Sequence, residues 1–482
     1  MYNLLGWIVS LALGLAVLVG PWFFGAWEMW WFWPFFCFIG LATLAGGVRL
    51  AIAGFKGNGL SAAADTVLIL ALTVPFLFYA VIRCLSDGVV WMEAERMLLL
   101  HLSGVLVAGL TVFTLGQGQK TVLFWGLFGS LALMGLYGIL NHMLFDSHHV
   151  LWMPRYEQYA GRATGPYFCP DHFAGAMELL FGMSAALLLD RSRRGAIVRC
   201  FAGAAALLAV WGVLLSQSRG AGLTLVVLAC CILVWGFAQW PRAVRWYWRM
   251  ISLSLLLLLA ILVVTTHPDY ITRFKTYGGL HTAGQHEERT LVEDVVYKLQ
   301  RTARGRMFGG AWRAWKTAPW LGIGPGMHQH LWPQFAATDD GNREQGVWPT
   351  LTNHDFHSYE VHNDWLQLLE EFGVVGMVLF LLPMGALIRA LWLRMRSERL
   401  DWQRSYGLDA GDGRYAWVLC AWLALAAMGF HSLGDFNLQM PGTVWMLALL
   451  LGLGVAAGEK QKAEMGKAGS RSPRERFAGV AK

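Results

Sequence analysis

Long apolar runs recur along almost the whole chain, with polar turns between them. Each run has about 17–25 residues, the length that an α-helix needs to cross a bilayer. We count twelve runs, at residues 3–20, 30–53, 65–83, 97–115, 121–141, 172–190, 197–217, 221–240, 249–266, 364–393, 415–433 and 441–458. Helices are expected because the bilayer core offers no water to backbone polar groups. The pattern therefore predicts an all-α polytopic membrane protein.

The composition agrees with that prediction. Of the 482 residues, 56% are hydrophobic and only 14% are charged, whereas soluble domains carry about 25% charged residues. So many apolar side chains do not fit in one buried core, which excludes an ordinary soluble protein. The first run has no basic segment before it and no convincing small-residue cleavage site, so we interpret it as an uncleaved helix.

Basic residues are unevenly distributed between the loops. With a cytoplasmic N-terminus, the inner loops carry most of them, and the outer hairpins near Trp27 and Asp435 carry none. This is the positive-inside pattern of helical membrane proteins. Most of the net charge of +7 therefore reflects the membrane topology, and the remaining positive charge suits the binding of an anionic substrate. No nucleic-acid partner is expected. The inner basic residues include Arg49, Lys56, Lys120, Arg191, Arg193, Arg194, Arg199, Arg242, Arg245, Arg249, Arg394, Arg396, Arg399 and Arg404.

Two long polar stretches fall on the outer side. Residues 1–266 are expected to form nine helices with an outer loop at 142–171. Residues 267–363 are expected to form a folded outer subdomain, because a structureless loop of that length is unusual. Residues 364–458 supply the last three helices, and the basic tail 459–482 is expected to be cytoplasmic and disordered.

The outer subdomain contains the segment GRMFGGAWRAWKTAPW, which predicts a helix ended by Pro319. Basic side chains lie near one face of this helix and aromatic side chains lie on another. Such a helix is typical of a membrane interface, with its basic face toward a substrate or toward lipid head groups. The basic residues are Arg306, Arg313 and Lys316.

The segment EVHNDWLQLLEEFGVVG joins this subdomain to the next apolar run. Asn363 is a good helix N-cap, so it is expected to hold His362 where the helix meets water. Histidine accepts a proton near neutral pH, since its ordinary pKa is about 6.5. Gly373 and Gly376 are expected on one helix face, where they allow a neighbouring helix to approach closely.

The spacing His362–Asn363, nine residues, Gly373, two residues, Gly376 resembles the signature of the O-antigen ligase and O-antigen polymerase superfamily. That superfamily also includes bacterial protein O-oligosaccharyltransferases. Four more segments are similar to it: ATGPYFCPDHFAGAMEL, LLSQSRGAG, GRMFGGAWRAWKTAPWLGIGPG and HSLGDFNLQMPG. Two positions depart from its pattern, since Asp171 stands where Asn is common and Ala318 where a polar residue usually precedes the proline.

The resemblance implies a GT-C-like membrane glycosyltransferase in the bacterial inner membrane. Such an enzyme moves a glycan from undecaprenyl diphosphate to an acceptor hydroxyl on the periplasmic face, with inversion and without a metal or other cofactor. It implies His362 as the base, and Arg219 and Arg306 as stabilisers of the departing diphosphate. The position of this helix arginine in the family pattern is ambiguous. Its distance in residues from Pro319 favours Arg304, whereas the Gly–Arg pair and the basic face of the helix favour Arg306. The other implied substrate-binding residues are Arg304, Arg313, Asn363, Arg162, His172 and Asp435.

Several alternatives stay open. The implied acceptor is lipid A core or a growing glycan, with a protein side chain as the third choice. Membrane lipids are expected as further partners, because they surround the helices. A secondary transporter or lipid flippase also suits twelve helices, although no repeated half is evident. A metal site among His354, Asp355, His357, Glu360 and His362 fits no standard zinc spacing. Cys84 and Cys169 both fall on the outer side, as a disulfide or as free thiols, and His328 and His330 are interpreted as loop-surface residues.

Overall fold

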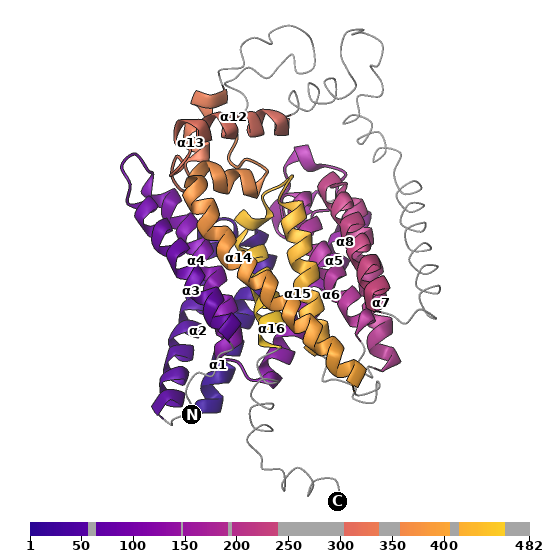
Figure 1. The fold of residues 1–482 in the computed structure, drawn as a ribbon. Coiled ribbons are helices and arrows are strands. Elements are labelled where there is room, and N and C mark those ends of the chain that lie inside the picture. The colour runs from indigo at the N-terminus through magenta and orange to yellow at the C-terminus, as the bar shows by residue number, and fades with distance from the viewer. Residues whose placement is uncertain are drawn as a thin grey trace, which may run out of the picture.

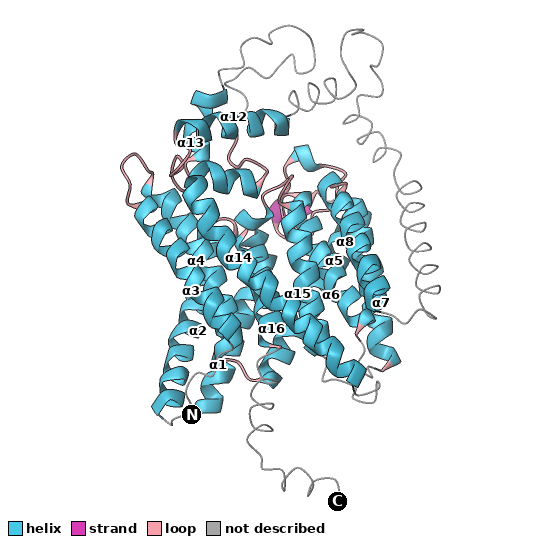
Figure 2. Ribbon diagram, in the orientation of Figure 1, coloured by secondary structure: helices cyan, strands magenta, loops and turns pink. Residues whose placement is uncertain are grey.

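A computed structural model of the chain describes residues 1–55, 64–145, 148–190, 195–239, 303–336, 357–404 and 414–457. Within these ranges the protein is a bundle of long helices that run roughly along one direction (Figure 1). The strands among the described residues are the two of a short hairpin at one end of the bundle (Figure 2). This architecture confirms an all-α fold.

The α-helices are α1 (Tyr2–Gly14), α2 (Met29–Phe55), α3 (Ala64–Cys84), α4 (Trp91–Phe113), α5 (Gln117–Phe145), α6 (Pro170–Leu189), α7 (Ala196–Ser216), α8 (Arg219–Gln239), α12 (Ala303–Thr317), α13 (His328–Ala336), α14 (Asp364–Arg404), α15 (Arg414–His431) and α16 (Pro441–Ala456). The short turns are η1 (Leu15–Val19), η2 (Gly20–Trp22), η3 (Phe24–Ala26), η4 (Glu157–Tyr159) and η6 (Asn437–Gln439). The hairpin consists of β1 (His149–Val150) and β2 (Met153–Pro154), which are antiparallel.

Eleven of the twelve expected runs form helices in the described part of the chain. Eight of these helices are long and apolar enough to span a membrane, and three shorter apolar helices begin at Arg219, Tyr415 and Pro441. The remaining run, 249–266, and the tail 459–482 lie outside the described residues. The chain is thus a multi-pass membrane protein, and a total of twelve spans remains a prediction.

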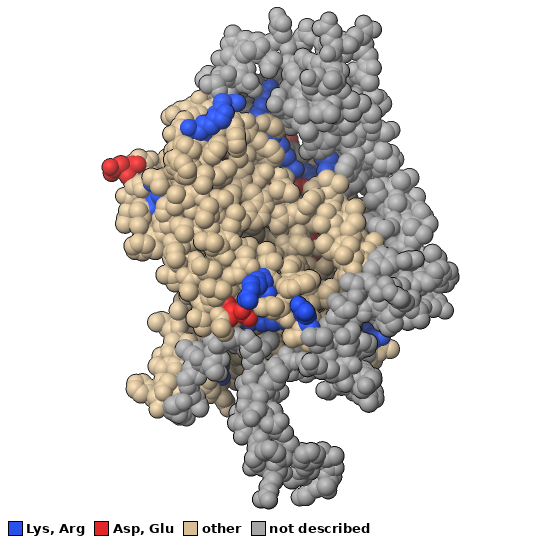
Figure 3. Space-filling model, in the orientation of Figure 1, with Lys and Arg blue, Asp and Glu red and all other residues tan. Residues whose placement is uncertain are grey.

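Charged side chains lie at two levels on the face drawn in Figure 3, and the surface between the levels is almost uncharged. Apolar side chains are exposed on the outward faces of the long helices, for example Leu44 on α2 at 72% and Phe78 on α3 at 67%. Such exposure is unfavourable in water but suits contact with lipid chains. The arrangement agrees with helices that span a bilayer.

Close helix packing relies on small residues. Helix α16 packs against α4 and α15, and its Trp445 is fully buried. A side chain at Gly454 would place its Cβ 2.5 Å from the Cβ of Ala421 on α15. Small residues at such positions allow helix backbones to approach, which is a main source of stability inside a membrane.

Helix α14 is broken near its start. Gly373 has φ 67° and ψ −173°, a conformation that only glycine adopts readily. The Gly-rich turn 319–324 that follows α12 docks at this break through four backbone hydrogen bonds. The donors are the N–H groups of Ile323, Gly324, Val374 and Val375, and the acceptors are the carbonyls of Glu370, Glu371, Pro319 and Trp320, at N···O distances of 2.9, 3.0, 2.9 and 3.1 Å.

The expectation that Gly373 and Gly376 share one face of a continuous helix is therefore half right. A Cβ on Gly376 would lie 3.0 Å from the Tyr79 ring of α3, so this glycine does allow close helix packing. A Cβ on Gly373 would lie 2.4 Å from the carbonyl oxygen of Trp320. The prediction for Gly373 is wrong because the spacing argument assumed an unbroken helix, whereas here a loop replaces the helical hydrogen bonds.

Two other expectations have definite outcomes. Helix α12 ends at Thr317, two residues before Pro319, which confirms the predicted helix and its end. Cys84 and Cys169 are both buried free thiols, so the disulfide is not formed in this structure. Among the described residues no group of three or more His, Cys, Asp and Glu has an arrangement suited to a metal ion, but His354 and Asp355 of the metal alternative lie outside these residues, so that alternative stays untested.

Candidate active site

The candidate site lies at the end of the bundle that carries α12 and α13 (Figure 1). Five segments that are far apart in the sequence contribute to it. They are the loop before α6, the α7–α8 turn, the start of α12, the start of α14, and the loop between α15 and α16. The tertiary structure alone brings these segments together.

The start of α14 fixes His362. Asn363 caps the helix, because its Oδ1 accepts a hydrogen bond from the N–H of Leu366 at 3.0 Å, which confirms the predicted cap. The Nδ2 of Asn363 donates to the carbonyl of Leu433 at 3.0 Å, so the helix start is also tied to the α15–α16 loop. His362 itself has φ 57°, a left-handed conformation that is uncommon outside glycine. The surrounding contacts hold it there.

His362 is paired with a buried carboxylate. Its Nδ1 lies 2.9 Å from Oδ1 of Asp435, whose side chain is 1% exposed, while the imidazole is 24% exposed. Burial by itself raises the pKa of Asp435, but the hydrogen bond from His362 and the nearby imidazole of His172 outweigh it and hold the pKa well below its ordinary value. An ionised Asp435 accepts the Nδ1–H of His362, which leaves Nε2 as the proton acceptor. No described residue forms a hydrogen bond with that Nε2.

A second buried carboxylate lies between two arginines. One oxygen of Asp171 is 3.0 Å from Nη2 of Arg162, and the other is 3.1 Å from Nη2 of Arg304. Arg162 also donates through Nε to the carbonyl of Ser216 at 2.7 Å, at the end of α7. The carboxylate therefore joins α12 to α6 across the top of the bundle.

Arg304 connects this cluster with the His362 pair. A Cβ placed on Gly434 would lie 3.8 Å from Nη1 of Arg304, so the guanidinium reaches the loop residue next to Asp435. The positive charge of Arg304 is also one of the causes that lower the pKa of Asp435. The base candidate and the arginines thus belong to one continuous cluster.

An aromatic ring separates two imidazoles of the cluster. Phe436 lies edge-on to His362 at 4.6 Å between ring centres and edge-on to His172 at 4.5 Å. His172 is almost fully buried, at 4% exposure. It therefore lies behind the ring as part of the site wall, rather than at the solvent-facing position that His362 holds.

The α7–α8 turn supplies Arg219. Gln217 adopts a left-handed conformation with φ 52° that ends α7, and the Oγ of Ser218 then caps α8 by accepting from the N–H of Ala221 at 3.3 Å. Arg219 is the first residue of α8 and is half-buried. A Cβ on Gly220 would lie 3.4 Å from the imidazole of His431, which itself lies 3.8 Å from Oδ2 of Asp435, so this turn borders the same cluster.

Two of the expected basic residues point elsewhere. Arg313 donates from Nε and Nη2 to the carbonyl of Phe335, at 3.0 and 2.7 Å, and so braces α12 against α13. Arg306 follows Arg304 by two residues, which turns it about 200° around the helix. Among the described residues no hydrogen bond or ion pair of Arg306 is present. The structure therefore brings Arg304, and not Arg306, next to Asp171.

Residues 204–381 of the chain match a family model described as O-Antigen ligase. This part of the chain is similar to the O-antigen ligase family. No curated protein matches the chain. The matched region runs from α7 into α14 and includes Arg219, Arg304, Arg306 and His362. This match confirms the resemblance to the O-antigen ligase and polymerase superfamily, whereas Asp435 lies outside the matched residues.

Two further buried residues border the cluster beside the matched region. His431, at the end of α15, lies 2.9 Å through Nδ1 from Glu178 on α6, and 3.8 Å through Nε2 from Oδ2 of Asp435. Both side chains are buried. A carboxylate inside an apolar run is uncommon and usually functional, so Glu178 was recognisable from the sequence.

The interpretation of His328 as a loop-surface residue is wrong. Its side chain is 1% exposed, and its Nδ1 lies 2.8 Å from Glu370 while its Nε2 lies 3.0 Å from the Oγ of Ser358. These contacts fasten α13 to α14 close to the Gly373 break. Local sequence patterns do not reveal these contacts, because His328, Ser358 and Glu370 come from separate segments of the chain.

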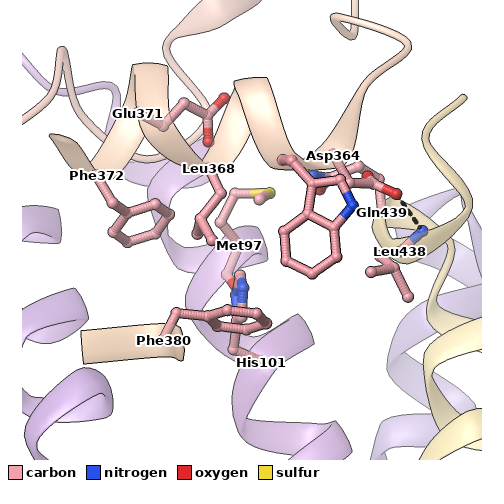
Figure 4. A pocket seen from close by; sticks show the side chains of 10 residues that line it. Met97, His101, Asp364, Leu368, Glu371, Phe372, Phe380, Leu438 and Gln439 are labelled. Carbon is pink, nitrogen blue, oxygen red and sulfur yellow. Dashed lines mark hydrogen bonds between the residues drawn. The ribbon is translucent and has the colours of Figure 1, made fainter. Parts of the chain in front are cut away.

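A cavity of about 40 Å³ lies beneath the first turns of α14. Figure 4 shows Phe372 and Phe380 of α14 and Met97 and His101 of α4 around it, with Asp364 at one side. The volume suits a few water molecules at most. It is too small for a sugar or a diphosphate, so the open cluster around His362 is the better candidate for substrate.

Proposed function

We propose that this protein is a glycosyltransferase of the bacterial inner membrane that moves a glycan from undecaprenyl diphosphate to an acceptor hydroxyl. The acceptor is a sugar of lipid A core or the end of a polysaccharide chain. The reaction is inverting and uses no metal. The observation that carries the proposal is the partly exposed imidazole of His362, which is oriented by buried Asp435 beside the Arg304 guanidinium.

In the proposed reaction the acceptor oxygen attacks the anomeric carbon while the bond from that carbon to the diphosphate oxygen breaks. A single displacement from the opposite side inverts the anomeric centre. The hydroxyl proton passes to Nε2 of His362, and Asp435 stabilises the imidazolium that results. The diphosphate leaves with the additional negative charge.

Arginine suits the stabilisation of that charge, because it stays protonated and its planar fork matches phosphate oxygens. We assign this role to Arg304 and Arg162, which already bind a carboxylate, together with Arg219 at the start of α8. The position of Arg304 beside Asp171 supports it over Arg306. Loss of one such donor costs about 3 kcal/mol, or roughly a hundredfold in rate.

The site is proposed to face the periplasm. Its segments lie at the end of the bundle that carries α12 and α13, opposite to the N-terminus, which is expected on the cytoplasmic side (Figure 1). Undecaprenyl diphosphate places its phosphates at the membrane surface, and we propose that the starts of α6, α8 and α14 lie at that depth. His172 and Asn363 then serve to shape and hold the site.

The proposal is tested by complementation of a strain that lacks the protein, with glycan transfer read on gels. His362→Ala is expected to abolish transfer while the protein still inserts in the membrane. The matched control is His149→Ala, which removes an exposed histidine of β1 at the same end of the bundle. Normal transfer by His362→Ala, with inserted protein at the wild-type level, would refute the proposal.

A further inference from the structure

The carboxylate of Asp171 makes the contacts that a bound anion would make with two arginines. Each of its carboxylate oxygens contacts a different guanidinium, Arg162 at 3.0 Å and Arg304 at 3.1 Å. Its side chain is 12% exposed, as is that of Arg162, while Arg304 is 26% exposed. A planar carboxylate across two guanidinium groups makes the same charge-assisted hydrogen bonds that phosphate oxygens make.

We propose that Asp171 occupies the diphosphate position in the empty enzyme and is displaced when the lipid-linked donor binds. The inference rests on the proposed function, since it takes the diphosphate as the ligand of these arginines. The N–H groups that face Asp171 are directed donors, so a phosphate oxygen and a carboxylate oxygen compete for them. Asp171 is thereby an internal competitor of the donor and not one of its ligands.

The arginines have supports other than Asp171. Arg162 is anchored through Nε to the carbonyl of Ser216. Arg304 lies on α12, which is fastened to α13 through Arg313 and followed by the turn that docks at Gly373. Removal of the carboxylate charge is therefore expected to leave both guanidiniums in place.

Charge balance gives the direction of the effect. Asp171 and Asp435 offset the charges of Arg162 and Arg304 while no donor is present. A bound diphosphate adds further negative charge near Asp171, and like charges at such distances repel strongly in a partly buried site. The carboxylate therefore weakens diphosphate binding, and after transfer it competes with the product for the same arginines and speeds its release.

The test is diphosphate binding by the full chain in lipid nanodiscs, measured by calorimetry with inorganic diphosphate and no added divalent cation. Asp171→Asn keeps the shape of the side chain and removes its charge. We expect it to bind diphosphate at least about tenfold more tightly than the wild type. The control is Asp65→Asn, which removes a carboxylate from an arginine pair of 3.0 Å with Arg389, away from the site, and should leave the affinity unchanged.

Equal or weaker binding by Asp171→Asn would overturn the inference, because Asp171 would then merely hold the arginines in place. A melting curve of each variant shows whether it is folded, and Asp171→Ser serves as the second variant if the first is not. Glycan transfer by the wild type is scored separately in the complementation assay. Unchanged affinity with normal wild-type transfer rejects only the role of Asp171, while absent transfer rejects the proposed function.

Discussion

Substitution of Gly373 by alanine tests whether the break in α14 positions the site. Alanine at φ 67° and ψ −173° is strained by about 1–3 kcal/mol. Its Cβ would also lie 2.4 Å from the carbonyl oxygen of Trp320, which is too close for any real contact. The variant must therefore shift the turn 319–324 away from α14.

The magnitude follows from the four backbone hydrogen bonds that join this turn to α14. Each contributes about 0.5–1.5 kcal/mol net, so loss of all four costs about 2–6 kcal/mol. Because this turn helps to hold α12, the Arg304 guanidinium loses its fixed position beside Asp171. We expect glycan transfer by Gly373→Ala to fall by at least about a hundredfold, with a lower melting temperature.

The assay combines thermal unfolding of the purified protein with glycan transfer in the null strain. Gly385→Ala is the matched control, because it changes the same residue type in the same helix and its Cβ meets no atom within 4 Å. That variant should melt and transfer like the wild type. If Gly373→Ala also behaves like the wild type, the break does not position Arg304 and the reasoning fails.

Two further predictions concern the charged cluster. Arg304→Ala should lower transfer about a hundredfold, whereas Arg306→Ala should lower it less than about tenfold, and a reversed order in the same transfer assay would restore Arg306 as the diphosphate ligand. Asp435→Asn should lower transfer by about 10²–10⁴-fold, because His362 loses the acceptor that orients it. Since the pKa of Asp435 is lowered in the folded protein, its contribution to stability is present at neutral pH and is lost as the pH falls below about 4. Melting curves at pH 7 should therefore separate the wild type from Asp435→Asn, and this difference should shrink as the pH falls below about 4.

Much of the architecture was determined by the sequence itself. The bilayer requires long apolar helices, so the positions and approximate ends of the helices in the described residues follow from run length alone. The ends of two helices were also predictable from neighbouring residues, since Asn363 caps α14 and α12 ends just before Pro319, as expected. The same holds for His362, since its spacing to the later glycines already resembled the family signature.

The tertiary structure alone decided how the site is put together. His362 and its partner Asp435 are 73 positions apart, and Arg304 and Asp171 are 133 apart, so no local pattern connects them. A helical spacing rule placed Gly373 on a packing face, but a distant turn breaks the helix there. Helix-forming rules depend on neighbours within a few residues, whereas charge pairs and backbone docking depend on which segments meet in space. That is why the sequence named the kinds of groups in the candidate site, and only the folded chain brought Arg304 next to Asp171 and paired His362 with its carboxylate.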